Sequence, residues 1–517
     1  MTSRSSLDHR NLNHSPIMHK YEAVPIDPRV EHNLAQIMND LGRSDDVVVR
    51  EIRYEKTGAV VTAIVYIDGL SDAAAINCYI YDVLNHSIKT AFTEEREEEI
   101  CTTVLAKELL FGMGAIRTVS EMASLYKYLL AGEAVILMEG DALAYHADVR
   151  EWNGRAVTES TTQTVVRGPR ESFTETLRTN TSLVRRKIKD PRLWLETISM
   201  GRLTQTDVTI MYINGIAKPS VIEEVRSRIR AIDIDSVLDS SFIEELIEDG
   251  KFSLFPTVYN SELPDSVAAQ LLEGKVAVLV DGTPNVLLVP TQFISFFQSP
   301  EDYYQRPVYA SMLRLLRFGS FFISLLFPSL YIAITTFHRE MLPTSLLISV
   351  AAQREGVPFP AFVEALVMEI TFEILREAGL RMPRAIGQAV SVVGTLVIGQ
   401  AAVEAGIVSA AMVIVVSVTA ISTFTLPAYS MSIPVRILRF VFMAVSASFG
   451  LFGIFMGLFV LLLHLCSLQS FGEPYMSPLS PYRSTFMEDS LVRLPKWMSF
   501  KRPDTAVGSG ERRYRRR

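Results

Sequence analysis

The stretch FPAFVEALVMEITFEILREAGL (359–380) decides the fold of the C-terminal half of this chain. It is long enough to cross a bilayer as a helix, and most of its residues are apolar. It nevertheless carries Glu369, Glu373 and Glu377, which fall on one stripe at about 100° per residue. Arg376 belongs to the same stripe, and Glu364 is a further acidic residue near the start of the stretch.

Three interpretations of this acidic membrane-helix stripe remain open. Charges at membrane depth are costly, so they face a bundle interior, a water path or each other. In the first interpretation the stretch is a helix with solvated charges that lies on the membrane surface or packs against other subunits. In the second it lines or gates a polar pathway. In the third it is part of a buried structural charge network.

Composition indicates a protein that is half soluble and half embedded in a membrane. The chain has 517 residues, of which 49% are hydrophobic, and a formal net charge of −7. Residues 1–30 contain no signal-peptide core, so we expect the soluble half on the cytoplasmic side. The three cysteines (Cys78, Cys101 and Cys466) are too far apart for a disulfide framework or a zinc site. With no phosphate-binding loop, dinucleotide fingerprint or nucleophile elbow, we predict no enzyme, no cofactor and no metal.

The soluble half contains an internal repeat. VTAIVYIDGLSD (61–72) resembles DVTIMYINGIAKPS (207–220), and LLAGEAVILMEGDALAY (129–145) resembles LLEGKVAVLVDGTPNVL (271–287). Both pairs are separated by about 145 residues, and their glycines align at expected turns. Apolar runs that alternate with helices predict an α/β cytoplasmic domain made of two duplicated subdomains, followed by an α-helical polytopic membrane domain.

These patterns give the following expected organisation. The segments are a disordered N-terminal arm (1–44), a first α/β subdomain (45–150), a basic helical connector (151–206), a second α/β subdomain (207–312), a transmembrane domain of five or six helices (313–472) and a basic cytoplasmic tail (473–517). The connector concentrates its arginines and lysines between residues 167 and 192, with few aromatic residues among them. This pattern favours contact with neighbouring subunits or anionic lipid over nucleic acid.

Positive charges set the expected membrane topology. Basic clusters at 314–317, 376–384 and 436–439 and the basic tail should all lie in the cytoplasm. Spans at 318–337, 359–376, 385–403 and 407–427 place every cluster there. The remaining apolar region, 440–468, is either one long helix or a tight hairpin. A hairpin gives six crossings and a single helix gives five.

Residues 385–403 are uncharged and rich in glycine and alanine, which suits close helix packing or a narrow pore wall. The pore-lining candidates in this segment are Val392, Val393, Thr395 and Val397. Rings of small apolar side chains can close a pore by dewetting, and we expect the acidic stripe at or near such a path.

Several long motifs spread over residues 45–485 resemble one family. They are VVRGPRESFTETLRTNTSLVRRKIKDPRL (165–193), LLEGKVAVLVDGTP (271–284), SPEDYYQRP (299–307), FPAFVEALVMEITFEILREAGLRMP (359–383), GQAAVEAGIVSAAMVIVVSVTAISTFTLP (399–427) and SFGEPYMSPLSP (470–481). Together they resemble the GerA family of spore germination proteins, and specifically the germinant receptor A subunit of endospore-forming bacteria.

The resemblance implies a role, partners and a location. It implies a homo-oligomeric, nutrient-gated ion channel in the spore inner membrane that passes monovalent cations at the start of germination. The implied partners are a transporter-like B subunit, which is thought to bind the nutrient, and a lipoprotein C subunit. The alternatives are a family paralogue that accompanies the dipicolinate-release machinery, or a secondary transporter. Inverted repeats in the membrane half would favour a transporter, and none are evident in the sequence.

Overall fold

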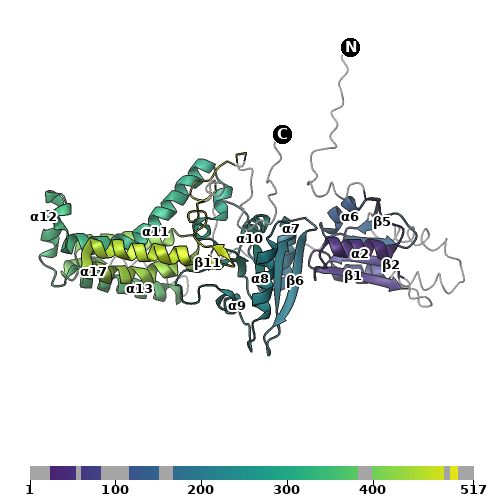
Figure 1. Cartoon of the computed structure of the whole chain (residues 1–517), viewed down its shortest axis with the longest axis horizontal. Coiled ribbons are helices and arrows are strands. Elements are labelled where there is room, and N and C mark those ends of the chain that lie inside the picture. The colour runs from purple at the N-terminus through teal and green to yellow at the C-terminus, as the bar shows by residue number, and fades with distance from the viewer. Residues whose placement is uncertain are drawn as a thin grey trace, which may run out of the picture.

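The computed structural model describes residues 24–53, 60–82, 116–150, 163, 167–381, 399–482, 489–495 and 497–498. Three parts follow one another along the longest axis of the molecule (Figure 1). A small α/β subdomain at one end contacts a second α/β subdomain in the middle, and a helical bundle forms the other end. The described chain therefore separates into a sheet-containing half and a helical half.

The first subdomain is a five-stranded antiparallel sheet in the order β1-β2-β4-β5-β3. Its strands are β1 (Val47–Arg53), β2 (Val60–Ile67), β3 (Arg117–Val119), β4 (Ala134–Met138) and β5 (Ala144–Ala147). Its helices are α2 (Val30–Asp40), α3 (Ala73–Ala75), η1 (Ile76–Tyr81) and α6 (Met122–Leu129). The central strand β4 is buried along its whole length, as a run of apolar residues requires.

The second subdomain has the equivalent order, β6-β7-β9-β10-β8. Its strands are β6 (Leu193–Met200), β7 (Thr206–Ile213), β8 (Tyr259–Ser261), β9 (Val276–Val280) and β10 (Val286–Val289). Its helices are α7 (Leu177–Lys187), α8 (Pro219–Arg230), α9 (Ser240–Ile247) and α10 (Pro264–Leu272), followed by the short turns η2 (Phe293–Phe297) and η3 (Pro300–Tyr303). The repeated segments 129–145 and 271–287 thus supply equivalent adjacent strands, β4–β5 and β9–β10.

The two subdomains also share individual hydrogen bonds. The side chain of Asn33 bonds the backbone of Asp27 twice, at 3.0 and 2.6 Å, and Asn180 bonds Thr174 in the same way at 2.8 and 2.6 Å. The turn glycines Gly140 and Gly282 have φ angles of +83° and +88°, which disfavour any residue with a side chain. Matching side-chain hydrogen bonds and matching turn conformations of this kind are typical of two subdomains related by duplication.

Helices α2 and α7 correct two of the expected boundaries. Residues 24–44 were expected in a disordered arm, but α2 buries Val30, Leu34 and Ile37 in the core of the first sheet. Likewise, the whole of α7 and the strand β6 were assigned to the connector 151–206, yet Leu183 and Val184 of α7 and Leu193 of β6 lie in the core of the second subdomain. Each subdomain therefore begins with a helix that the predicted boundaries did not include, and the second subdomain also gains the strand β6. Residues 1–23 lie outside the described part of the chain.

A buried ion pair joins the two subdomains. Arg185 of α7 donates to both carboxylate oxygens of Asp46 at 2.7 and 2.8 Å, and both side chains are essentially inaccessible to solvent. Beside this pair the Trp194 indole nitrogen donates to the Asp40 carbonyl at 3.2 Å. A Cβ at Gly42 would lie 2.1 Å from the Trp194 ring, so this close approach requires glycine. The contact is therefore specific in shape as well as in charge.

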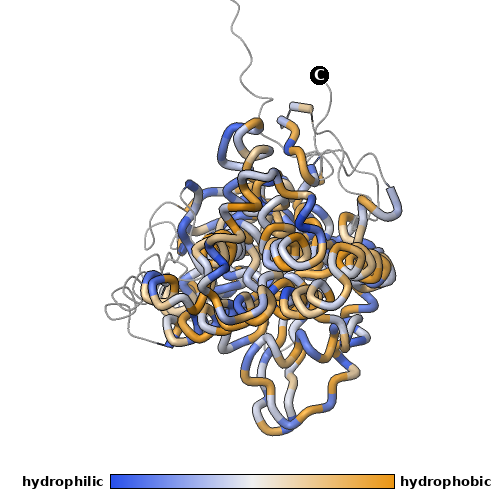
Figure 2. Tube along the Cα trace, turned by 90° about the vertical axis from the view of Figure 1, so that its left-hand side faces the viewer, coloured by the Kyte–Doolittle hydropathy of each residue, from blue (hydrophilic) through white to orange (hydrophobic). Residues whose placement is uncertain are grey.

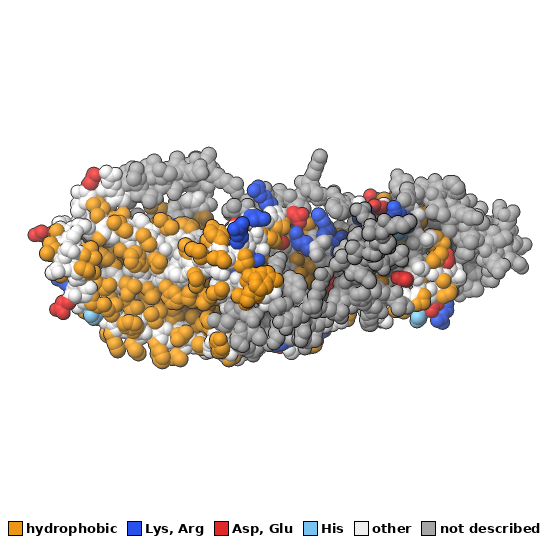
Figure 3. All heavy atoms as spheres, turned by 90° about the horizontal axis from the view of Figure 1, so that it is seen from above, with side chains coloured by type: hydrophobic (Ala, Val, Ile, Leu, Met, Phe, Trp, Pro, Cys, Tyr) orange, Lys and Arg blue, Asp and Glu red, His pale blue; other side chains and the backbone are white. Residues whose placement is uncertain are grey.

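The helical half consists of helices packed around α11. Its helices are α11 (Pro307–Thr336), η4 (Arg339–Met341), α12 (Thr344–Arg354), α13 (Ala361–Arg381), α15 (Gly399–Glu404), α16 (Ala410–Phe424) and α17 (Tyr429–Ser467), followed by the hairpin β11 (Gln469–Ser470) and β12 (Glu473–Pro474). In the view down the bundle the helices are largely apolar (Figure 2). Apolar side chains also cover the visible outer face of this half (Figure 3). Two of the described helices, α11 and α17, are long and apolar enough to cross a membrane.

Helix α17 reverses direction at Gly450, where φ is +63° and ψ is −143°. Gly450 lies against Phe337 and His338 at the outer end of α11, the end remote from the sheets. At the inner end, the His464 ring returns to within 2.9 Å of Ser253 in the second subdomain. Of the two forms left open for residues 440–468, the structure has the hairpin, because glycine permits the left-handed turn.

The close packing of the hairpin depends on two more glycines. A Cβ at Gly453 would lie 2.8 Å from Val445, and one at Gly457 would lie 2.7 Å from Phe442. Both distances are too short for carbon atoms, so a side chain at either position would separate the two halves of the hairpin. Small residues allow helices to approach closely in this way.

Candidate functional site: a charged junction in the helix bundle

The guanidinium of Arg439 connects four helices. From α17 it donates to Glu369 of α13 at 2.6 Å, to the Ser324 carbonyl of α11 at 2.8 Å and to the Thr423 hydroxyl of α16 at 3.0 Å. Arg439 and Glu369 are both fully buried, with side-chain exposures of 1% and 0%. Because an isolated buried charge is very costly, this ion pair and its two extra hydrogen bonds hold the helices in one arrangement.

One turn closer to the sheets, Glu373 makes a second connection between α13 and α17. Arg436 donates to both of its carboxylate oxygens, one of them at 2.9 Å, and Arg376 lies 3.5 Å away on the same helix as Glu373. The side chains of Glu373 and Arg436 are about one-fifth exposed. Glu377 instead pairs with Arg381 at 2.7 Å on the open surface of α13. The stripe therefore passes from a buried pair to a solvated one along two turns of helix.

Glu364, nearer the outer end of α13, caps the first turn of α16. Its carboxylate accepts hydrogen bonds from the Ser409 backbone N–H at 2.6 Å and from the Ser409 hydroxyl. Ser409 in turn accepts from the Met412 N–H, as the N-cap of α16. Carboxylates are favoured at helix N-termini, where backbone N–H groups lack partners and the helix dipole is positive. Arg354 of α12 lies 3.7 Å from the same carboxylate.

The stripe residues named from the sequence thus have distinct surroundings. Glu369 and Glu373 each face an arginine of α17, whereas Glu377 faces Arg381 of its own helix. Among the described residues, the second oxygen of Glu369 has no hydrogen-bond partner. The pore-lining candidates Val392, Val393, Thr395 and Val397 fall within 382–398, outside the described residues.

Sequence reasoning missed the roles of Arg436 and Arg439, which it used only to set topology. Their spacing did carry a signal. Glu369 and Glu373 are one turn apart on one helix, and the two arginines are nearly one turn apart on another. Opposite charges with matching spacing in two apolar segments predict partners, since charges at that depth pair with one another.

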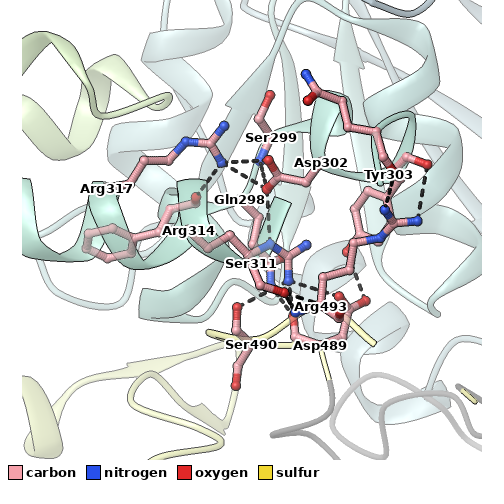
Figure 4. A network of polar contacts seen from close by, with 12 residues as sticks. Gln298, Ser299, Asp302, Tyr303, Ser311, Arg314, Arg317, Asp489, Ser490 and Arg493 are labelled. Atoms are coloured by element: carbon pink, nitrogen blue, oxygen red, sulfur yellow. Dashed lines mark hydrogen bonds and ion pairs between the residues drawn. The ribbon is translucent and has the colours of Figure 1, made fainter. Parts of the chain in front are cut away.

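A second polar cluster joins the helical half to the sheets (Figure 4). Buried Asp302 in η3 accepts from Arg314 at 3.0 Å and from Arg317 at 2.9 Å. Both arginines come from the first turns of α11, and Asp302 also accepts from the Ser299 N–H at 3.2 Å to cap η3. One carboxylate thereby fixes the direction in which α11 leaves the second subdomain.

Residues 489–493, close to the C-terminus, complete this cluster. Asp489 accepts from Arg314 and from the Tyr303 hydroxyl, both at 2.9 Å. Arg493 donates to the carbonyls of Gln305 at 2.7 Å and Tyr303 at 3.3 Å. Burial, with Asp489 nearby, raises the pKa of the Tyr303 phenol well above its usual value, so this group stays a neutral donor.

Within the described residues, no group of three or more histidine, cysteine or acidic side chains is arranged to hold a metal ion. The two described cysteines, Cys78 and Cys466, are exposed and unbonded. The polar chemistry described above is instead that of ion pairs between helices.

The fold and these junctions define a class of protein: a duplicated α/β half fixed to an apolar helical bundle in which opposite charges pair between helices. Residues 35–505 match the family model described as "Bacillus/Clostridium GerA spore germination protein". The chain belongs to this family.

Relatives in the family are similar over most of their length. "Spore germination protein KA" of Bacillus subtilis (strain 168) is 47% identical over 489 residues, which cover 94% of this chain and 88% of that protein. "Spore germination protein A1" of the same strain is 41% identical over 466 residues, covering 90% and 94%. The crystal structure of the N-terminal domain of the A subunit of the Bacillus megaterium spore germinant receptor GerK3 is 36% identical, covers 52% of this chain and 97% of that one, and aligns with a TM-score of 0.41.

Proposed function

We propose that this chain is the A subunit of a spore germinant receptor and forms, with copies of itself, a nutrient-gated channel for monovalent cations in the spore inner membrane. Family membership supports the role in germination, since the named relatives are spore germination proteins. The transporter-like B subunit and the lipoprotein C subunit are the proposed partners. In this scheme the B subunit binds the nutrient, and this chain carries out no catalysis.

The proposed topology has six crossings, with both the α/β half and the tail in the cytoplasm. It is supported by the directions of the described helices. Arg439 meets Ser324 and Ser446 meets Ser329, so α11 and the first half of α17 run outward together. Helices α13 and α16 and the second half of α17 run back. Residues 385–403, which are mostly outside the described part, would supply the remaining crossing.

The ion pair and hydrogen bonds around Arg439 are the observation that best supports the proposed channel. A helix bundle that served only as an anchor could be entirely apolar, whereas this one keeps an ion pair shared by four helices at its centre. Charges in such places are typical of membrane proteins that move ions or change conformation. In this arrangement the arginines neutralise Glu369 and Glu373. We propose that the stripe attracts cations when these pairs separate, and that Val392, Val393, Thr395 and Val397 line the path.

An oligomer is part of the proposal, because a single bundle of this size has few polar faces with which to enclose water. The full chain, purified in mild detergent, should have the native mass of a ring of several copies, and single-particle images should show rotational symmetry. A monomer under conditions that preserve membrane proteins would contradict the channel.

A further inference from the structure

An apolar groove of about 580 Å³ runs along the outside of the α17 hairpin and ends at the second subdomain. Val441, Phe449 and Val460 of the hairpin line it, together with Phe252 of the loop that follows α9. Its wall is nearly all apolar and belongs to a helix long and apolar enough to cross a membrane.

The inner end of the groove is polar. There the Ser253 hydroxyl and the His464 ring are 2.9 Å apart, and the Phe255 ring packs against the same histidine. Lys251, two residues before Ser253 in the chain, is exposed, and the apolar Phe252 between them is fully exposed as well. A fully exposed aromatic residue next to a lysine, at the inner end of a membrane helix, is typical of a loop at the level of lipid headgroups.

The lining of the groove favours one kind of occupant. The groove is apolar along its length and open on its outer side, so a hydrocarbon chain can lie in it lengthwise. Its polar inner end suits a headgroup, which an apolar helix of a second protein does not have.

We propose that this groove holds one phospholipid, with an acyl chain along α17 and its headgroup beside Lys251 and the Ser253–His464 pair. An acyl chain matches the apolar wall, and a headgroup phosphate matches the hydrogen-bonding groups and the positive charge at the inner end. The lipid would attach the second subdomain to the cytoplasmic leaflet. This inference rests on the membrane insertion proposed above and does not depend on ion conduction.

The test uses the full chain in vesicles of phosphatidylethanolamine and phosphatidylglycerol that contain a phospholipid with a photoreactive acyl chain. Irradiation should label peptides from 438–464 and 251–255. Val460→Trp, which fills the groove, should lower this labelling at least fivefold. The matched control is Leu463→Trp, because Leu463 is similarly exposed on the same helix (56% against 61%) but does not line the groove.

The headgroup is tested with Lys251→Gln. It should weaken labelling by a phosphatidylglycerol probe more than by a zwitterionic probe. Equal losses with both probes would remove Lys251 from headgroup recognition.

Two outcomes would overturn the proposal. Equal labelling in Val460→Trp and Leu463→Trp would mean that lipid does not occupy the groove. A disulfide between copies that carry Phe449→Cys would identify a second copy of the chain as the occupant. Resistance to extraction at alkaline pH is measured in parallel, because a protein that fails this test is not inserted and the proposed function itself would be at fault.

Discussion

Breaking the Glu369–Arg439 pair should prevent assembly, whereas breaking the Glu373–Arg436 pair should not. In Glu369→Gln the fully buried Arg439 keeps its hydrogen bonds to Ser324 and Thr423 but loses its counter-charge. Removal of one partner from a buried pair costs about 3–5 kcal/mol, or more than a hundredfold in an equilibrium constant. Glu369→Gln receptors should therefore be nearly absent from spore membranes.

Removing both charges of the Glu369–Arg439 pair should restore the amount of assembled receptor. The double variant Glu369→Leu with Arg439→Leu replaces both charges by apolar groups, a change that is often neutral in buried pairs. Assembled receptor measured by immunoblot and native gel should return to within a few-fold of the wild-type level. If Glu369→Gln alone reaches the wild-type level, the inference from burial and pairing is wrong.

Glu373→Gln then tests conduction, because this pair is partly exposed and its loss should cost only about 1–2 kcal/mol. Cation release after a mixture of amino acids, sugars and nucleosides, divided by assembled receptor, should fall several-fold. Glu377→Gln is the matched control, since Glu377 is exposed and pairs, among the described residues, with Arg381 of its own helix. Unchanged release per assembled receptor in both Glu373→Gln and any assembled Glu369→Gln would exclude the stripe from the mechanism.

Three further predictions concern other parts of the chain. Val393→Ala or Val397→Ala should cause cation leakage and germination without nutrient; spores that stay dormant would count against a pore there. Arg185→Met should lower the free energy of unfolding by about 3–5 kcal/mol, and Arg178→Met, which removes the partly exposed pair with Asp68, by less than about 1 kcal/mol; equal changes in thermal unfolding would contradict the buried pair. Burial and nearby Glu248 raise the pKa of Glu244 to about 7, so stability contributed by its protonated form is lost as pH rises from about 4.5 through 7. Glu244→Gln should therefore stabilise the protein by about 1–3 kcal/mol at pH 8 and hardly at pH 5, and an equal effect at both would refute it.

The repeat was visible in the sequence because turns and buried strands constrain residue type strongly. Gly140 and Gly282 adopt the same positive φ, and β4 and β9 are both entirely buried. Helix α2 was missed although Val30, Leu34 and Ile37 have helical spacing, because its polar surroundings outweighed that short signal. A local sequence pattern thus predicts that a helix or strand exists. The boundary of the domain that contains this element is harder to predict, because it depends on packing.

The charged stripe was also visible, but its partners were not identified. Glu369 and Arg439 are far apart in sequence, and several basic clusters offered alternative partners. Only the packing of four helices selects Arg439 over Arg381 or Arg384 for this position. The same holds for Asp46 and Arg185, whose pairing depends on how two separately folded units meet.

The cluster around Asp302 also implies an order of events during synthesis. Arg314 and Arg317 emerge from the ribosome long before Asp489 and Arg493, so α11 would enter the membrane while its attachment to the sheets is half built. The attachment is completed only after residues 489–493 have been synthesised and have folded back onto α11 and η3. A chain shortened before Asp489 would contain all the described helices and still lack the hydrogen bonds that Asp489 and Arg493 contribute to this joint.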